Sequence, residues 1–293
     1  MPELPEVETM RRGLLPLTGQ VIRRVRLLPC ERRPLTITPA QIDFCRSQTG
    51  QKIIAIERLG KRVILRLANE LALVIEPRMT GLLLLADPPT ADHLRVRWEC
   101  VPPSSKRSGP RGKTTSFWYW DRRGLGVLRL VTPAQFAAYY GPQRIGPDAL
   151  QLSPVELRAR LQGTSRPIKV ALLDQKLLAG VGNLYASEML HLAKIHPAVP
   201  CDCLRGGDWS RLHAALVEVL ETAIRYEGST LGDGTYRNVL NQDGGYQNEH
   251  RVYARHKELC PACQKAAVVR IVQAQRATFF CPRCQRARGV KST

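Results

Sequence analysis

The sequence predicts an α+β fold in several domains, with an N-terminal antiparallel β-sandwich flanked by helices, a helical C-terminal domain and a metal-binding β-hairpin at the end. Three observations predict it. Short apolar runs alternate with turn signals up to about residue 133, the apolar spacing then becomes helical, and two Cys-x-x-Cys pairs follow near the end. A chain of 293 residues is long enough for two domains, each with its own core.

Eight runs rich in Val, Ile and Leu predict the strands of the sandwich. They are residues 20–28, 52–60, 62–67, 71–77, 81–87, 94–99, 116–121 and 126–131. One helix is expected before them, over residues 5–17. Residues 102–115 are polar, basic and rich in Pro and Gly, so they predict a long hairpin loop.

The second half is predicted to be helical after a Pro/Gly-rich stretch. Pro167 opens a helix whose apolar spacing continues over residues 168–179, and Gly180 ends it. A tight turn leads into a second helix that starts near Asn183 and stops before Pro197. The backbone N–H groups of this turn favour a phosphate, although a plain helical hairpin is an equally good interpretation. The expected domains are 1–135 (sandwich), 136–150 (linker), 151–250 (helical) and 251–293 (metal finger).

The cysteines near the end have the spacing of a metal site. Cys260 and Cys263 form one pair, and Cys281 and Cys284 form a second pair after 17 intervening residues. Four thiolates close a tetrahedral zinc site and leave no open position, so one structural Zn²⁺ is expected to hold a small β-hairpin. The nine cysteines lie in a chain without a recognisable secretion signal, which argues against a disulfide framework.

The charge predicts a polyanionic partner. A formal charge of +19 and a pI near 10 favour nucleic acid over a membrane surface, although a supercharged surface without a partner is an alternative. Residues 251–293 carry ten Lys or Arg against one acid, Glu258. Neither a signal peptide nor an apolar run of membrane-spanning length is seen, so a cytoplasmic location is expected.

Four segments together resemble one enzyme family. "MPELPEVET", "LGKRVILRL", "IKVALLDQKLLAGVGNLYASEML" and "QRATFFCPRC" are similar to the formamidopyrimidine-DNA glycosylase and endonuclease VIII family of base-excision repair. The "PELPEVE" start indicates the formamidopyrimidine branch. The resemblance implies a helix-two-turn-helix domain, a zinc finger, and a bifunctional DNA glycosylase and AP lyase. It further implies a bacterial-type, nucleoid-associated monomer that acts on double-stranded DNA with damaged bases or abasic sites.

The resemblance also assigns catalytic residues. Pro2, once Met1 is removed, would be the nucleophile, and an α-amino group with a pKa of about 8 suits that role. Glu3 matches the general acid of the family, and Glu6 matches a second acid whose role is open. Lys61 and Arg276 match residues that contact phosphates and assist β- and δ-elimination.

Further positions match residues that bind DNA. Asn183 matches an asparagine whose side chain helps to bind a DNA phosphate. The resemblance also implies that the DNA lies between two lobes of the protein. Met79 and Arg123 match side chains that fill the gap left by an extruded base. Leu125 stands where a wedge phenylalanine is expected. Other departures are "EPRMTG" (76–81) for His-Leu-Gly-Met-Ser-Gly, Ala91 for a histidine and Thr164 for a lysine; nearby His93 is counted among the candidate DNA contacts.

Residues 228–250 occupy the place of the base-capping loop of the family. Their glycines predict mobility, and their Thr, Asn, Gln and Tyr side chains predict hydrogen bonds to a flipped base. Oxidised purines such as 8-oxoguanine and formamidopyrimidines are expected from the branch, with oxidised pyrimidines, abasic sites and cross-linked bases as alternatives. The non-enzymatic alternatives are a catalytically silent DNA-binding protein that keeps the scaffold, and a basic zinc-finger regulator or RNA-binding protein.

Overall fold

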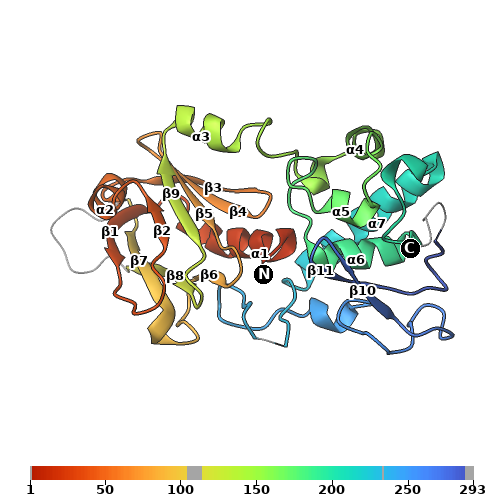
Figure 1. Cartoon of the computed structure of the whole chain (residues 1–293). Coiled ribbons are helices and arrows are strands. Elements are labelled where there is room, and N and C mark those ends of the chain that lie inside the picture. The colour runs from red at the N-terminus through yellow and green to blue at the C-terminus, as the bar shows by residue number, and fades with distance from the viewer. Residues whose placement is uncertain (1, 104–113, 233, 288–293) are drawn as a thin grey trace. The chain divides into compact units, whose positions relative to one another are not determined.

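The computed structural model describes residues 2–103, 114–232 and 234–287. They form two compact units (Figure 1). Unit 1 comprises residues 1–141 and 226–245, and unit 2 comprises residues 142–225 and 246–293. The segment 226–245, which the sequence-based boundaries put with the helical domain, therefore packs with the sandwich; the functional domain boundaries remain a prediction.

Unit 1 contains two β-sheets. The first has the strand order β1-β7-β8-β6, and the second has the order β2-β9-β5-β4-β3. All eight predicted strands are present, and their neighbours pair antiparallel. The strands are β1 (Val21–Leu27), β2 (Thr36–Thr38), β3 (Ile53–Leu59), β4 (Arg62–Leu67), β5 (Ala72–Glu76), β6 (Gly81–Leu84), β7 (Leu94–Val101), β8 (Thr115–Asp121) and β9 (Val127–Val131).

The short strand β2 was not predicted, and it pairs parallel with β9, which makes the second sheet mixed. The hairpin loop expected over residues 102–115 lies largely outside the described residues, since 104–113 are not among them. The strands that flank it, β7 and β8, form an antiparallel pair.

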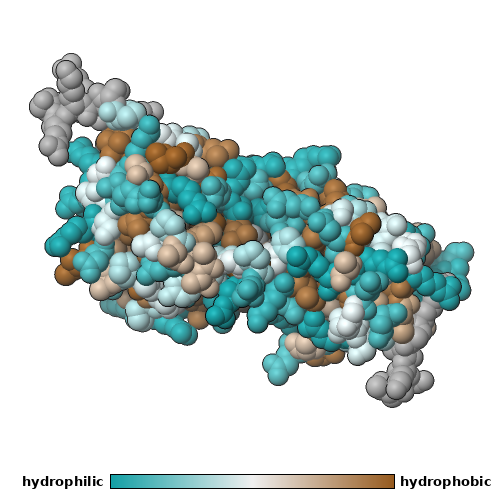
Figure 2. All heavy atoms as spheres, turned by 90° about the horizontal axis from the view of Figure 1, so that it is seen from above, coloured by the Kyte–Doolittle hydropathy of each residue, from teal (hydrophilic) through white to brown (hydrophobic). Residues whose placement is uncertain are grey.

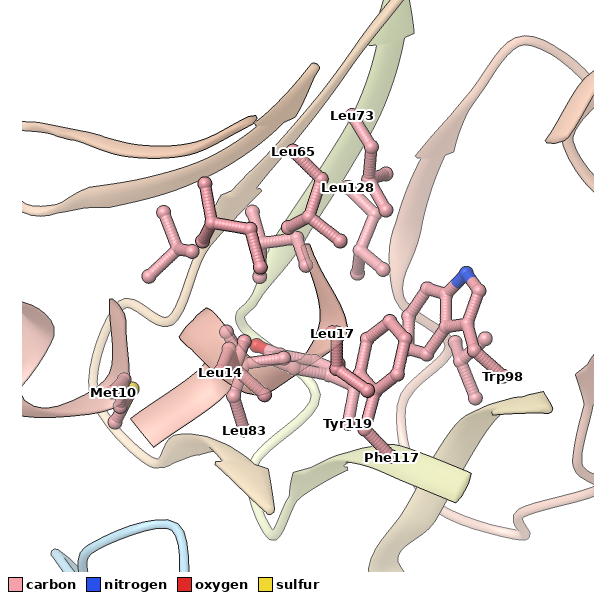
Figure 3. Close-up of a cluster of buried hydrophobic side chains, with 14 of the residues drawn as sticks. Met10, Leu14, Leu17, Leu65, Leu73, Leu83, Trp98, Phe117, Tyr119 and Leu128 are labelled. Atoms are coloured by element: carbon pink, nitrogen blue, oxygen red, sulfur yellow. The ribbon is translucent and has the colours of Figure 1, made fainter. Parts of the chain in front are cut away.

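Helix α1 (Leu4–Leu14) fills the space between the sheets, and Pro5 lies in its first turn (Figure 1). Figure 3 shows its apolar side chains Met10 and Leu14 among residues of both sheets. Leu65, Leu73 and Leu128 come from the five-stranded sheet, and Leu83, Trp98, Phe117 and Tyr119 come from the four-stranded sheet. The start of the chain is thereby anchored in the core of unit 1.

The helix expected over residues 5–17 continues past α1 as the 3-10 turn η1 (Leu15–Leu17). The helices α2 (Gln41–Gln48) and α3 (Pro133–Tyr140) and the 3-10 turn η2 (Ala91–His93) were not predicted. The segment 226–245 joins unit 1 through backbone bonds, because Val239 O accepts from Leu85 N at 2.8 Å. A Cβ at Gly13 would lie 2.2 Å from Val239 Cγ2, so a glycine is required where this segment packs on α1.

Unit 2 is mainly helical and ends in a two-stranded hairpin. Its elements are η3 (Ala149–Gln151), α4 (Pro154–Leu161), α5 (Ile168–Leu172), α6 (Asn183–Leu192), η4 (Cys201–Cys203), α7 (Gly206–Arg225), η5 (Tyr246–Glu249), β10 (Val269–Gln273) and β11 (Arg276–Phe280). The hairpin expected between the cysteine pairs is present and antiparallel.

The first predicted helix of unit 2 is shorter than expected. It ends at Leu172 and not at Ala179, because the Asp174 carboxylate accepts the N–H of Lys176 at 3.0 Å and replaces the helical bond with a local turn. The second helix starts at Asn183 as predicted.

Hydrophilic side chains cover most of the face in Figure 2, and apolar patches are small and separate. Among the helices that the structure describes, none combines the length and apolar character needed to span a bilayer.

Candidate functional site

The N-terminal end of α1 is buried and is held by one carboxylate. Pro2 is buried, and only 4 % of Glu3 and 3 % of Glu6 are exposed. Glu6 Oε2 accepts the backbone N–H of Glu3 at 2.8 Å, and its Oε1 accepts that of Ser229 at 3.0 Å. Glu6, whose role the sequence left open, thus joins the start of α1 to the segment 226–245 and positions the residues that precede it.

Lys61 lies half-buried in the turn between β3 and β4. Arg58, three residues earlier, donates to Gly60 O at 3.1 Å and to Glu8 Oε2 on α1 at 3.0 Å. Burial raises the pKa of Glu8, but hydrogen bonds from Arg11 and Arg12 and the charge of Arg58 outweigh it and lower that pKa to about 2. This buried ionic cluster fixes the Lys61 turn to the helix that starts at Pro2.

The turns that carry Met79 and Arg123 are brought together by a residue that the sequence analysis missed. The fully buried Asp121 carboxylate accepts the hydroxyl of Thr80, next to Met79, and the N–H of Arg123 at 3.1 Å. Its second oxygen accepts the N–H of Gly126 at 2.8 Å. The position of Asp121 at the end of an aromatic strand was the only available signal for this role.

The three gap-filling candidates differ in exposure. Met79 is 37 % exposed, Arg123 is exposed and Leu125 is half-buried. His93, in contrast, packs edge-on against the indole of Trp120, with 5.3 Å between the ring centroids. Met79 and Arg123 are therefore free to reach a partner, whereas the ring of His93 is partly committed to the protein.

The departure "EPRMTG" builds an ionic cluster beside Met79. The carboxylate of Glu76, 6 % exposed, lies 3.0 Å from Arg129 Nη1, 3.2 Å from Arg62 Nε and 3.5 Å from Arg78 Nε. Arg78 has a φ of 56°, a left-handed conformation that favours glycine. Three cations around one carboxylate leave a net positive charge on the turn that presents Met79.

The polar side chains of Thr235, Tyr236 and Asn238 form hydrogen bonds within unit 1, which differs from the expectation that this loop offers them to a flipped base. Asn238 donates to Glu227 Oε2 at 2.7 Å and accepts the N–H of Gln242 at 2.9 Å. Tyr236 is 4 % exposed, and its hydroxyl donates to Glu227 O at 2.9 Å. Thr235 accepts from Arg122 at 3.0 Å, which joins this segment to the Arg123 turn.

In unit 2, Asn183 links a buried lysine to the finger. Lys169, with no exposed surface, donates to Asn183 Oδ1 at 2.6 Å, and Asn183 Nδ2 donates to Ala277 O at 2.9 Å. Arg276, exposed at the start of β11, is the neighbour of Ala277. The Asn183 amide thus sets the place of the Arg276 strand, and Lys169 is a site residue that the sequence analysis did not single out.

The N–H groups of the Gly180 turn are only partly available for a phosphate. The Gln175 side chain accepts the N–H of Gly180 at 3.0 Å and donates to Val181 O at 2.9 Å. The expectation that Gly180 offers a free N–H is therefore wrong, because an unforeseen glutamine already satisfies it.

The four C-terminal cysteines converge as predicted. All four sulfur atoms lie within 4.8 Å of one another, with 3.9 Å between Cys260 and Cys284 and 3.7 Å between Cys263 and Cys281. Tetrahedral Zn–S bonds of about 2.3 Å place sulfur atoms about 3.8 Å apart, so the donor set fits zinc. The backbone N–H of Lys265 lowers the pKa of Cys263 to about 7, whereas burial raises the pKa of Cys281 and of Cys284.

Three buried side chains attach the finger to α6 or to the residues that follow it. Glu188 accepts the N–H groups of residues 251–253 at 2.8–3.0 Å. Gln285 accepts the N–H of Cys281 at 2.9 Å and donates to Ile195 O at 2.8 Å. His191 Nε2 lies 3.3 Å from Cys260 Sγ, in the manner of groups that orient a metal ligand. These three residues were missed because each acts on a segment far away in the sequence.

Known proteins match this chain over most of its length. Residues 1–128 match the formamidopyrimidine-DNA glycosylase N-terminal domain, residues 145–234 match its H2TH domain, and residues 267–287 match the zinc finger found in FPG and IleRS. A formamidopyrimidine-DNA glycosylase of Chloroflexus aurantiacus is 40 % identical over 97 % of this chain and 98 % of its own. The chain belongs to the formamidopyrimidine-DNA glycosylase family.

Solved structures of family members agree with this assignment. The Thermus thermophilus protein superimposes with a TM-score of 0.80 at 35 % identity, over 97 % of this chain and 98 % of its own. A Lactococcus lactis variant in complex with a Fapy-dG-containing DNA gives a TM-score of 0.83 at 32 % identity, over 98 % of this chain and 100 % of its own. As a formamidopyrimidine-DNA glycosylase family member, the chain is a base-excision repair DNA glycosylase with one structural zinc.

Proposed function

We propose that the chain excises oxidised purines, 8-oxoguanine and formamidopyrimidines, from double-stranded DNA through a covalent intermediate on Pro2, and then cleaves the strand. The observation that supports the proposal most directly is the buried start of α1. Pro2 and Glu3 adjoin there, and Glu6 fixes the backbone of Glu3 to that of Ser229.

The chemistry begins when Met1 is removed and Pro2 becomes a secondary amine. The nitrogen lone pair attacks C1′ of the damaged nucleotide, the N-glycosidic bond breaks, and the base leaves with the bonding electrons and a proton. Cleavage of the bond from C1′ to the ring oxygen, with a proton supplied to that oxygen, gives an iminium ion. Glu3, one residue from the amine, is the proposed source of that proton.

The iminium ion is an electron sink that acidifies C2′. Loss of a C2′ proton expels the 3′ phosphate, loss of a C4′ proton then expels the 5′ phosphate, and water releases the amine by hydrolysis. Lys61 and Arg276 are proposed to neutralise charge on these phosphates, since charge-assisted hydrogen bonds to phosphate are strong. The fixed turn of Lys61 and the exposed position of Arg276 support these roles.

The DNA must open for the damaged base to reach Pro2. Met79, Arg123 and Leu125 are proposed to fill the gap in the duplex, with leucine supplying apolar bulk without aromatic stacking. Their turns all form hydrogen bonds to the Asp121 carboxylate, which supports the proposal that the three side chains act together. His93 and Asn183 are proposed as further DNA contacts, with Asn183 acting mainly through the finger strand that it holds.

The proposed substrate, chromosomal DNA, also suggests an oligomeric state and a location. We propose that it acts as a monomer and in the cytoplasm, on chromosomal DNA of a bacterial-type cell. Sedimentation of the DNA complex, with one chain per lesion duplex, tests the first point.

Borohydride trapping tests the proposed function. The protein is incubated with an 8-oxoguanine:cytosine duplex and reductant, and the adduct is located by peptide mass spectrometry. An adduct on Pro2 is expected. Pro2→Gly keeps a primary amine and should still trap, more slowly, whereas a protein that retains Met1 should not, because Pro2 is then an amide.

The same experiment separates the alternatives. Trapping with an abasic duplex but not with 8-oxoguanine would preserve the lyase chemistry and refute the lesion class. An oxidised-pyrimidine duplex tests the next candidate lesion. Absence of any adduct with all three duplexes would contradict the enzyme and support a silent damaged-DNA-binding protein.

A further inference from the structure

Unit 2 contains a hollow of about 590 Å³ that has no role in the proposed base excision. It lies where the end of α6, the residues before α7 and the finger meet. Four cationic side chains and two buried apolar ones line much of it: Lys194, Arg205, Arg211, Arg286, Ile195 and Val199.

The charge of this hollow is not balanced by the residues that line it. Asp208 is the one acid among them, and it already accepts the N–H of Arg205 at 2.9 Å and the guanidinium of Arg211. Among the residues that the structure describes, the side chains of Lys194, Arg205 and Arg286 have no hydrogen-bond or ion-pair partner. Mutual repulsion of these cations is relieved when an anion binds among them.

Two further features indicate what kind of anion fits. Helix α7 is 20 residues long, begins at Gly206 beside Arg205, and directs the positive end of its dipole to this place. Ile195 and Val199 offer an apolar wall next to the cations. The volume is within the range of small-molecule sites, about 300–1,000 Å³. A ligand with a phosphate group and an apolar or planar part can pair its phosphate with the cations and pack its other part against the apolar side chains.

We propose that this hollow binds a nucleoside 5′-phosphate group, carried either by a free nucleotide or by the end of a nucleic-acid strand. Lys194, Arg205 and Arg286 contact the phosphate, and the sugar and base lie against Ile195 and Val199. Because Cys284 also lines the hollow, the ligand connects the finger to α6 and α7. The site is separate from the residues proposed for base excision and does not depend on them.

A matched pair of variants tests the site. Lys194 has a φ of 58°, and Lys257, outside the hollow, has a φ of 72°. Replacing either lysine by glycine removes one charge and relieves the same left-handed strain. Both Lys194→Gly and Lys257→Gly should therefore raise Tm slightly, but only Lys194→Gly should weaken binding of the ligand.

The measurement is titration calorimetry of the zinc-loaded, full-length protein with dGMP, with deoxyguanosine and with inorganic phosphate. We expect dGMP to bind more tightly than either fragment, Lys194→Gly to weaken it at least tenfold, and Lys257→Gly to change it less than twofold. A second arm compares duplexes with a recessed 5′-phosphate or 5′-hydroxyl end, to tell a strand end from a free nucleotide.

Tighter binding of the phosphorylated duplex that is lost in Lys194→Gly assigns the strand end as the source. Binding of dGMP without that preference assigns the free nucleotide. The proposal is overturned if neither dGMP nor the 5′-phosphate is distinguished from its unphosphorylated counterpart, or if both glycine variants lose binding equally. Base excision at an internal lesion, measured on the same proteins, is expected to stay unchanged.

Discussion

The candidate residues of unit 1 and those of the finger are held in different ways. In unit 1, Glu6, Glu8 and Asp121 are buried carboxylates that fasten the N-terminus and three turns to a large apolar core. The finger has a small cluster of five buried residues, two of which are cysteines of the metal site. A large core and internal carboxylates therefore hold the loops of unit 1, whereas the finger depends on its metal and on polar attachments to α6.

Removal of zinc should produce the largest difference between the two regions. Structural zinc contributes on the order of 10 kcal/mol to small domains, so Cys281→Ser or chelation should loosen β10 and β11 and abolish tight DNA binding. Strands β7 and β8 of unit 1 should keep their protection, as amide hydrogen exchange can show. Cys45→Ser is the control and should retain one zinc. If Cys281→Ser also retains its zinc and its affinity for DNA, the finger does not depend on the metal.

Acid should weaken the ion pairs of the Glu8 carboxylate in unit 1 between about pH 4.5 and pH 2. The pKa of Glu8 is lowered from 4.5 to about 2, so its ionised form stabilises the fold. This contribution, roughly 3 kcal/mol, is complete above pH 4.5 and is lost as the pH falls towards 2. Wild type and Glu8→Gln should therefore differ in free energy of unfolding at pH 7 and converge near pH 2, as hydrogen exchange in β3 and β4 measures. Glu57→Gln, which removes a surface ion pair, should show a gap below about 1 kcal/mol; an equal gap in both variants would contradict the special role of Glu8.

Asp121→Asn should loosen two turns at once. An amide cannot accept all the hydrogen bonds that the carboxylate accepts, which costs about 2 kcal/mol. Release of 8-oxoguanine should fall more than cleavage at an abasic site, because a site without a base needs less opening of the duplex. The exposed Asp92 supplies the control variant Asp92→Asn. Equal loss of both activities in Asp121→Asn would argue that the turns do not serve base extrusion.

The smallest effect is expected at Arg78. Arg78→Gly relieves a left-handed backbone worth about 1 kcal/mol and should raise Tm by a few degrees. It should also weaken DNA binding, and the slope of log K against log salt concentration should become less steep by about one. Glu70→Gly, at a φ of 65° in the turn before β5, should match the gain in Tm without the loss of affinity. Unchanged binding by Arg78→Gly would mean that the charge beside Met79 serves the fold alone.

Periodic patterns in the sequence predicted most of the regular elements. They did not predict the side-chain hydrogen bonds that hold the elements and turns together. The eight strands, α1, α6 and the cysteine hairpin follow from local alternation, spacing and turns. Helix α7 was missed although Leu212, Leu216, Val219 and Ala223 recur at helical spacing, a signal that was present. Strand β2 and helix α3 are too short to show a period.

The residues that hold the site could not be found in this way, for a physical reason. Glu6 and Ser229 are 223 positions apart, and Glu188 meets the finger 63 to 65 positions later. A buried carboxylate that accepts backbone N–H groups leaves no pattern in the residues it contacts, because every non-proline residue has the same N–H group. The motifs of the family predict which residues act, and the structure shows which side chains hold those residues in place.

The segment 226–245 returns to unit 1 after the chain has built most of unit 2. The polypeptide therefore passes from one unit to the other three times. A truncated protein that ends at Gly141 would lack Val239 and Tyr236, which belong to its own core, and would have to fold around a missing piece. The two units are consequently not modules that recombination or protein engineering can exchange by a single cut.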